Sequence, residues 1–156
     1  MTIRFACDRD IPGMIDLLQQ VGEVHHRIRP DLFRAGAQKY DEAALNALLT
    51  DPNRPILAAE IEGKLVGYAF CILQITENDP VLCDRKVLYI DDLCVEETLR
   101  GQGIAGALYE RVLEYARELG CDAVTLNVWC GNENAMKFYE KCGLKPQKIG
   151  METILC

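Results

Sequence analysis

Three glycines lie close together in the second half of the chain, at Gly101, Gly103 and Gly106. Residues 86–95 before them are typical of a long strand, and apolar residues recur at helical spacing after them. The first amides of a helix are unpaired and bind anions readily, and glycine lets the backbone approach an anion closely. The sequence therefore predicts a strand, an anion-binding loop and a helix, although the same glycines also suit a plain tight turn.

The remaining pattern predicts one α/β domain of ordinary size, since 156 residues suffice for a single core. Strands are expected at residues 2–6, 56–61, 65–75, 86–95, 124–128 and 148–156. Helices are expected at residues 11–21, 41–49, 104–119 and 132–142. Asp8 or Asp10 is expected to cap the first helix and Gly22 to end it. Because Pro30 disfavours a continuous helix, residues 25–34 are expected to form a loop or a broken helix.

Charge and cysteine content narrow the classes of partner. The formal net charge is −7 and the pI is near 4.9, whereas nucleic acids and anionic membranes bind basic surfaces. No stretch approaches the length of a membrane span, and the first ten residues lack the apolar segment of a secretory signal. The 8 cysteines contain no C-x-x-C pair. We therefore expect a cytoplasmic protein without a metal site, a nucleic-acid partner or a membrane partner.

The spacing of the glycines also matches the fingerprint of dinucleotide-binding domains. That fingerprint opens its domain, whereas only 50 residues follow Gly106 here, too few for the remaining strands of such a sheet. A nucleotide-binding P-loop is excluded because no Gly-Lys-Ser or Gly-Lys-Thr follows the loop. A dinucleotide-dependent oxidoreductase therefore stays as the least favoured alternative.

Residues 88–95, followed by Arg100 to Leu108, resemble the central motif of the GNAT family of N-acetyltransferases. The family pattern is Gln or Arg, two residues, Gly, one residue, then Gly or Ala, and it falls on Arg100, Gly103 and Ala105. Two spaced motifs in the same order are more specific than one glycine loop, so a second match carries weight.

The second family motif falls on Asn132, Ala135 and Tyr139, with Gly143-Leu144 where family members often have Gly-Phe. The resemblance covers about residues 55–156 well. It implies a single acetyltransferase domain over residues 1–156, with a coenzyme A-binding core at about residues 86–145. The implied fold is a central mixed, mostly antiparallel, twisted sheet that is flanked by helices and splayed between the fourth and fifth strands.

The resemblance also implies acetyl-coenzyme A as co-substrate. Its pantetheine arm would bond the backbone of Leu93, Cys94 and Val95 in the splay of the sheet, and Asn132 would either cap the last helix, bond the same arm, or do both. The pyrophosphate would lie on the glycine loop, which comprises Arg100, Gly101, Gln102, Gly103, Ile104, Ala105 and Gly106.

Acetyl transfer to an amine requires a proton donor for the leaving sulfur and an acceptor for the proton of the ammonium. Tyr139 is the expected acid, with a core tyrosine as the alternative. Asp91 and Asp92 are the candidates for the base, directly or through water, and the second carboxylate would bind a cationic substrate. Because neighbours on a strand point to opposite sides, only one of the two is expected to face the acceptor.

The sequence does not name the acceptor amine. A polyamine-like small molecule is suggested by the aspartates and the acidic charge, and a peptide or protein N-terminus is nearly as well supported. His25 and His26 are expected to form a surface pair, with a place in the acceptor pocket as the alternative. A homodimer is compatible with the family. The main alternative function is a module that binds acyl-coenzyme A and has lost catalysis.

Overall fold

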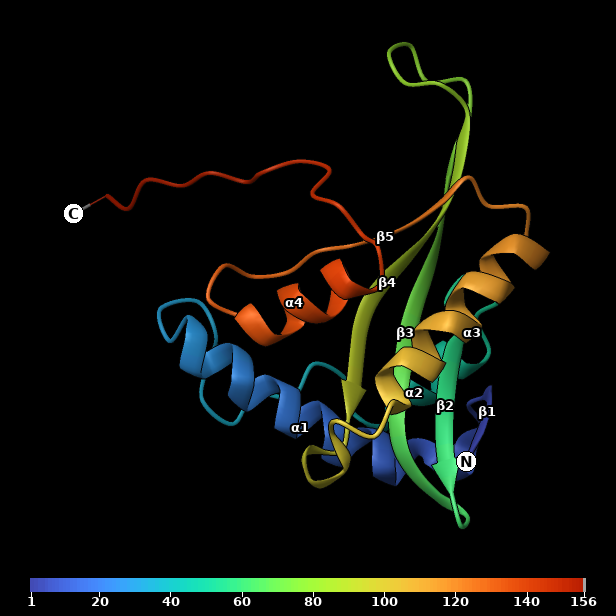
Figure 1. The fold of residues 1–156 in the computed structure, drawn as a ribbon, viewed down its shortest axis with the longest axis vertical. Helices are drawn as coiled ribbons and strands as arrows, with labels where there is room; N and C mark the ends of the chain where they lie inside the picture. Colours follow the sequence, from blue (N-terminus) through green and yellow to red (C-terminus); the bar gives the residue numbers. More distant parts are fainter. Residues whose placement is uncertain (156) are drawn as a thin grey trace.

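The structure is a computed structural model that describes residues 1–155, and within them the chain forms a five-stranded sheet in the order β1-β2-β3-β4-β5 (Figure 1). The strands are β1 (Thr2–Phe5), β2 (Ile56–Ile61), β3 (Lys64–Thr76), β4 (Arg85–Val95) and β5 (Ala123–Leu126). Strands β1 to β4 pair with one another in antiparallel fashion, and β5 pairs parallel to β4. This mixed, mostly antiparallel sheet confirms the expected fold class.

The helices cover both faces of the sheet. They are α1 (Ile11–Ile28), α2 (Glu42–Leu49), α3 (Ile104–Glu118) and α4 (Glu133–Lys141), with short 3-10 turns at Asp8–Asp10 and Glu97–Leu99. Helices α1 and α2 pack on one face, where Met14, Leu17 and Leu45 are fully buried. Helix α3 packs on the other face through residues such as Leu108 and Val112. The molecule therefore has an apolar layer on each side of the sheet.

Strands β4 and β5 separate partway along their length. They pair only from Val87 with Ala123 to Ile90 with Leu126, and β5 ends two residues earlier than its alternating pattern predicts. Beyond Ile90, β4 continues to Val95 against β3 alone. The splay expected between the fourth and fifth strands is therefore present, and it begins beside Asp91.

The first helix is longer than predicted. Asp10 precedes it, but its carboxylate accepts from the guanidinium of Arg4 and the amide of Cys7 and does not cap the helix. Helix α1 continues through Gly22 to Ile28, so the predicted end at Gly22 is wrong and residues 25–28 are helical. The break comes at Arg29, one residue before Pro30, which agrees with the effect of proline on the preceding residue.

Gly22 serves close packing. A Cβ atom built on it would lie 2.6 Å from the carbonyl oxygen of Ala37, in the segment that joins α1 to α2. The amide of Gly36 donates to the carboxylate of Glu23 in the same region. The glycine therefore lets this connecting segment lie directly on the helix.

The closing strand predicted at residues 148–156 is wrong for residues 148–155, and residue 156 lies outside the described range. After α4 the chain continues as an extended segment (Figure 1), in which the carboxylate of Glu152 accepts from the guanidinium of Arg29, just after α1, at 2.6 Å. Its apolar side chains Ile149, Met151, Ile154 and Leu155 are 72% to 89% exposed. None of the helices within residues 1–155 has both the length and the apolar composition needed to cross a membrane.

Gly22→Ala is expected to lower the free energy of unfolding by about 1–3 kcal/mol, because the new methyl group overlaps a backbone carbonyl. Gly106→Ala, in α3, meets no atom within 4 Å and is expected to raise it by about 0.5 kcal/mol through helix propensity. Urea denaturation of both variants measures the difference. Equal stabilisation by the two substitutions would contradict the packing role of Gly22.

Candidate functional site

Strand β4 has one extra residue where the sheet splays. Ile90 pairs with Cys71 and Asp92 pairs with Phe70, so Asp91 has no partner residue on β3 and forms a β-bulge. The side-chain alternation is therefore interrupted at Asp91. Ile90 lies on the face of α3, whereas Asp92 lies opposite Phe70 on the face of α1.

Both aspartates consequently reach groups on the same face. Asp91 accepts from Tyr40, whose ring packs on Phe70, and Asp92 accepts from Tyr68, which also lies on the α1 face. The expectation that only one carboxylate faces this side is wrong, because the bulge removes the alternation on which it was based.

Asp92 is a carboxylate with a raised proton affinity. Its Oδ2 accepts from the hydroxyl of Tyr68 at 2.7 Å. Burial raises the pKa of Asp92 to about 6, although the Tyr68 hydrogen bond and the charge of Lys39 oppose the shift. A carboxylate of this pKa is ionised at neutral pH and basic enough to take up a proton during a reaction.

Asp91 is already paired within the chain. Its Oδ2 lies 2.6 Å from Nζ of Lys39 and 3.1 Å from the hydroxyl of Tyr40. Lys39 and Tyr40 belong to the segment between α1 and α2, which sequence reasoning did not assign to the site. Their types and spacing form no motif, so only the tertiary structure reveals them.

Helix α4 places Tyr139 beside the same strand. Its ring is 6.4 Å from that of Tyr109 in α3, with an edge-to-face geometry. Burial and then the negative charge of Asp92 raise the pKa of Tyr139, so the phenol stays protonated at neutral pH. The negative charge of Asp92 therefore acts on the phenol of the predicted acid.

The glycine loop has the backbone that an anion site needs. Gly101 and Gly103 have φ angles of 80° and 83°, which favour glycine, and Gly103 begins α3 without a side-chain cap. Gly101, Gln102 and Gly103 are exposed, and so is Arg100, whose Nε donates to the carbonyl oxygen of Val95 at 3.3 Å. The first amides of α3 therefore face solvent beside a cation.

The remaining predicted cofactor residues lie along the same edge. Leu93, Cys94 and Val95 form the part of β4 beyond its pairing with β5, and Ile104, Ala105 and Gly106 form the first turn of α3. The side chain of Cys94 is buried on the α1 face, with its Sγ 3.7 Å from the carbonyl oxygen of Leu17. A free strand edge that leads to a glycine loop fits a long ligand with an amide-rich arm and a phosphate group.

Asn132 caps α4, since its side chain accepts from the amide of Ala135 at 3.3 Å. Just before it, Trp129 meets the ring of Phe33 edge-to-face at 5.3 Å, and Phe33 lies 5.0 Å from His25. His25 and His26 are half-buried, so each keeps part of its side chain at the surface, and Nδ1 of His26 lies 2.7 Å from the carbonyl oxygen of Phe33. Burial and then the charge of Lys39 lower the pKa of His25.

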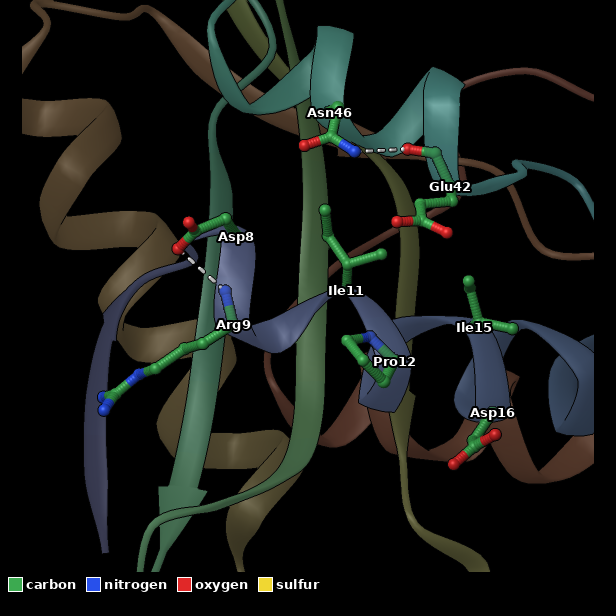
Figure 2. A pocket seen from close by; sticks show the side chains of 8 residues that line it. All are labelled: Asp8, Arg9, Ile11, Pro12, Ile15, Asp16, Glu42 and Asn46. Atoms are coloured by element: carbon green, nitrogen blue, oxygen red, sulfur yellow. Dashed lines mark hydrogen bonds between the residues drawn. The ribbon is translucent and has the colours of Figure 1, made fainter.

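A separate pocket of about 500 Å³ lies between the first turns of α1 and α2 (Figure 2). Among its lining residues are Ile11, Pro12 and Ile15, with Asp16 and Glu42 at its edge. It contains none of the residues that sequence reasoning assigned to the site. The site instead follows an open strand edge.

Comparisons with known proteins agree with this arrangement. A family model described as the acetyltransferase (GNAT) family matches residues 21–144. An uncharacterised N-acetyltransferase of Methanocaldococcus jannaschii is 32% identical over 90 residues, which are 58% of this chain and 38% of that protein. The chain therefore spans well under half of the length of this curated relative.

Solved structures match over the whole chain. A mutant of the BH1408 protein from Bacillus halodurans superposes with a TM-score of 0.96 and 33% identity, covering 100% of both chains. An aminoglycoside N-acetyltransferase in complex with CoA has a TM-score of 0.72 and covers 99% of this chain and 100% of that one. At 15% identity, the second match compares the fold alone.

Asp92→Asn is expected to stabilise the protein at pH 7 by about 1–3 kcal/mol. The folded-state pKa of Asp92 lies above its ordinary value of 3.8, so the folded protein binds the proton more tightly than the unfolded chain. The contribution of Asp92 to the free energy of unfolding is therefore fully present below about pH 4, and it is lost as the pH rises through about 6. Asparagine can still accept from Tyr68 and carries no charge.

Urea denaturation at pH 4 and at pH 7 measures this effect. The Asn variant should exceed the wild type at pH 7 and approach it at pH 4. Asp16→Asn, at an exposed position of α1, makes the same change of charge as a control. Equal stabilisation by both variants at pH 7 would assign the effect to net charge and not to the burial of Asp92.

Proposed function

The chain belongs to the acetyltransferase (GNAT) family, and we propose that it is a single acetyltransferase domain that moves an acetyl group from acetyl-coenzyme A directly to a primary amine. The observation that carries this proposal is the buried Asp92, which accepts from Tyr68 on the part of β4 that β5 no longer covers, on the strand that leads to the glycine loop. A proton acceptor thus lies on the strand whose free edge would hold the thioester.

Each part of the site has a proposed role. The backbone of Leu93, Cys94 and Val95 holds the pantetheine arm as an additional strand would, and the amides of the glycine loop with Arg100 bind the pyrophosphate. Asn132 keeps α4 in register by capping it. When bound, acetyl-coenzyme A supplies a thioester whose carbonyl carbon accepts the lone pair of the amine.

The structure supports a division of labour between the two aspartates. We propose that Asp92 takes the proton of the ammonium, directly or through one water molecule, because its pKa is about 6. Asp91, which already holds an ammonium group in the chain, binds the cationic acceptor. Tyr139 donates its proton towards the leaving sulfur, and its raised pKa keeps that proton in place until the thiolate forms.

The acceptor is proposed to be a polyamine-like small molecule or an amine of a peptide. Two carboxylates on one face, with the ring of Tyr40 beside Asp91, suit an alkyl ammonium.

A homodimer is proposed as well, since the exposed apolar side chains of residues 149–155 would be covered by a second copy. Light scattering should then give twice the molar mass of the chain.

Purified protein mixed with acetyl-coenzyme A is expected to release free thiol with at least one primary amine. The screen comprises polyamines, aminoglycosides, amino acids and peptides. Calorimetry with coenzyme A and with NAD should show binding of the first alone. Coenzyme A binding without turnover on any acceptor would favour a non-catalytic module, and binding of NAD alone would favour an oxidoreductase.

Tyr139→Phe is expected to lower kcat by about ten-fold to a hundred-fold, because it removes the proton donor and keeps the ring packed on Tyr109. The affinity for coenzyme A, measured by calorimetry, should change little. Tyr115→Phe in α3, whose ring packs on Phe5, is the matched control and should leave kcat unchanged. Unchanged turnover in Tyr139→Phe would remove Tyr139 from the acid role.

A further inference from the structure

A primary amine of the chain itself lies in the proposed acceptor site. The ammonium group of Lys39 is 2.6 Å from Oδ2 of Asp91, in the loop between α1 and α2. Its charge also acts on Asp92, where it lowers a pKa that burial raises. Lys39 thus places an aminobutyl arm against Asp91, the carboxylate that is proposed to bind the acceptor amine.

This contact is better defined than an ordinary surface ion pair. The side chain of Asp91 is only 15% exposed, and the hydroxyl of Tyr40 donates to the same oxygen. The Lys39 ammonium also lies 5.5 Å from the centre of the Tyr40 ring. Burial lowers the pKa of Lys39, but the hydrogen bond and charge of Asp91 outweigh it and leave that pKa raised.

The backbone around Lys39 is held on several sides. The amide side chain of Gln38 donates to the carbonyl oxygen of Tyr40 at 2.6 Å. Nδ1 of His26 lies 2.7 Å from the carbonyl oxygen of Phe33, and Ala37 sits against Gly22. The segment therefore presents Lys39 to Asp91 from a fixed position.

The lysine nevertheless remains displaceable. Its side chain is 47% exposed, so water can solvate its ammonium when it leaves Asp91, which offsets part of the lost ion pair. An amine from solution can therefore exchange with it at low cost. While Lys39 pairs with Asp91, an incoming ammonium cannot bind that carboxylate. The apparent affinity for the acceptor is therefore its intrinsic affinity multiplied by the fraction of protein molecules in which Asp91 is free.

We propose that Lys39 is a built-in pseudosubstrate: it occupies the place of the acceptor ammonium, and an acceptor binds by displacing it. This inference rests on the proposed function of the site. It also narrows the acceptor class to amines on a linear alkyl arm, such as the end of a polyamine or a lysine side chain, because the site already accommodates an aminobutyl arm of that shape.

Calorimetric binding of putrescine, in the presence of coenzyme A, tests the proposal. Putrescine is the probe because it carries the same aminobutyl arm. Lys39→Met removes the competing ammonium and is expected to bind putrescine about three-fold to ten-fold more tightly than the wild type. Lys39→Arg keeps a cation on Asp91 and should bind no more tightly than the wild type.

Lys64→Met, at an exposed position at the start of β3, is the control for the change of net charge and should leave the affinity unchanged. A second measurement needs no variant. In protein whose lysines carry isotope-labelled methyl groups, the NMR signal of Lys39 should shift on addition of putrescine, while that of Lys64 stays in place.

Weaker or unchanged putrescine binding in Lys39→Met, or binding to neither protein, would overturn the proposal. So would an NMR signal of Lys39 that does not respond to putrescine. These failures are distinct from failure of the proposed function, which is judged by thiol release from the wild type in the acceptor screen. A protein that acetylates other amines and ignores putrescine would keep its function and lose the pseudosubstrate.

Discussion

The bulge at Asp91 determines the geometry of the whole site. Because β4 carries one more residue than β3 between Ile90 and Asp92, two consecutive carboxylates lie on one face of the sheet. At the same point β5 leaves β4, which frees the strand edge that runs from Asp91 to Val95. The two carboxylates proposed to handle protons and the edge proposed to hold the pantetheine arm are therefore consequences of the same few residues.

This arrangement has an energetic cost that the fold offsets elsewhere. A buried carboxylate is unfavourable, and the hydroxyl of Tyr68 supplies only one hydrogen bond to Asp92. Tyr68 is fully buried in the layer under α1, so it is held against Asp92 by apolar packing. The layer that stabilises the domain thus also maintains a carboxylate whose pKa is about 6. Stability and reactivity are opposed at this position.

The sequence predicts local features more accurately than tertiary ones. The turn at the glycine loop and the cap at Asn132 follow from φ angles and hydrogen bonds within a few residues, and both appear as expected. The bulge has no such signature, since Asp91 and Asp92 suit a regular strand equally well. The predicted end of the first helix at Gly22 is wrong for the same reason. The role of Gly22 depends on a contact with Ala37, which lies beyond the end of α1 in the segment that follows it.

The same distinction separates the two halves of the site. The loop at residues 100–106 needs only local backbone geometry, so a motif identifies it and relatives with different acceptors can share it. The acceptor side is built from the end of α1 and from Phe33 and Lys39, whose positions depend on where α1 stops and on contacts such as that of Gly22 with Ala37. Moving the end of α1 by one turn would move Lys39 away from Asp91. If Asp91 binds the acceptor as proposed, the length of α1 and the path of the segment after it help to set acceptor choice.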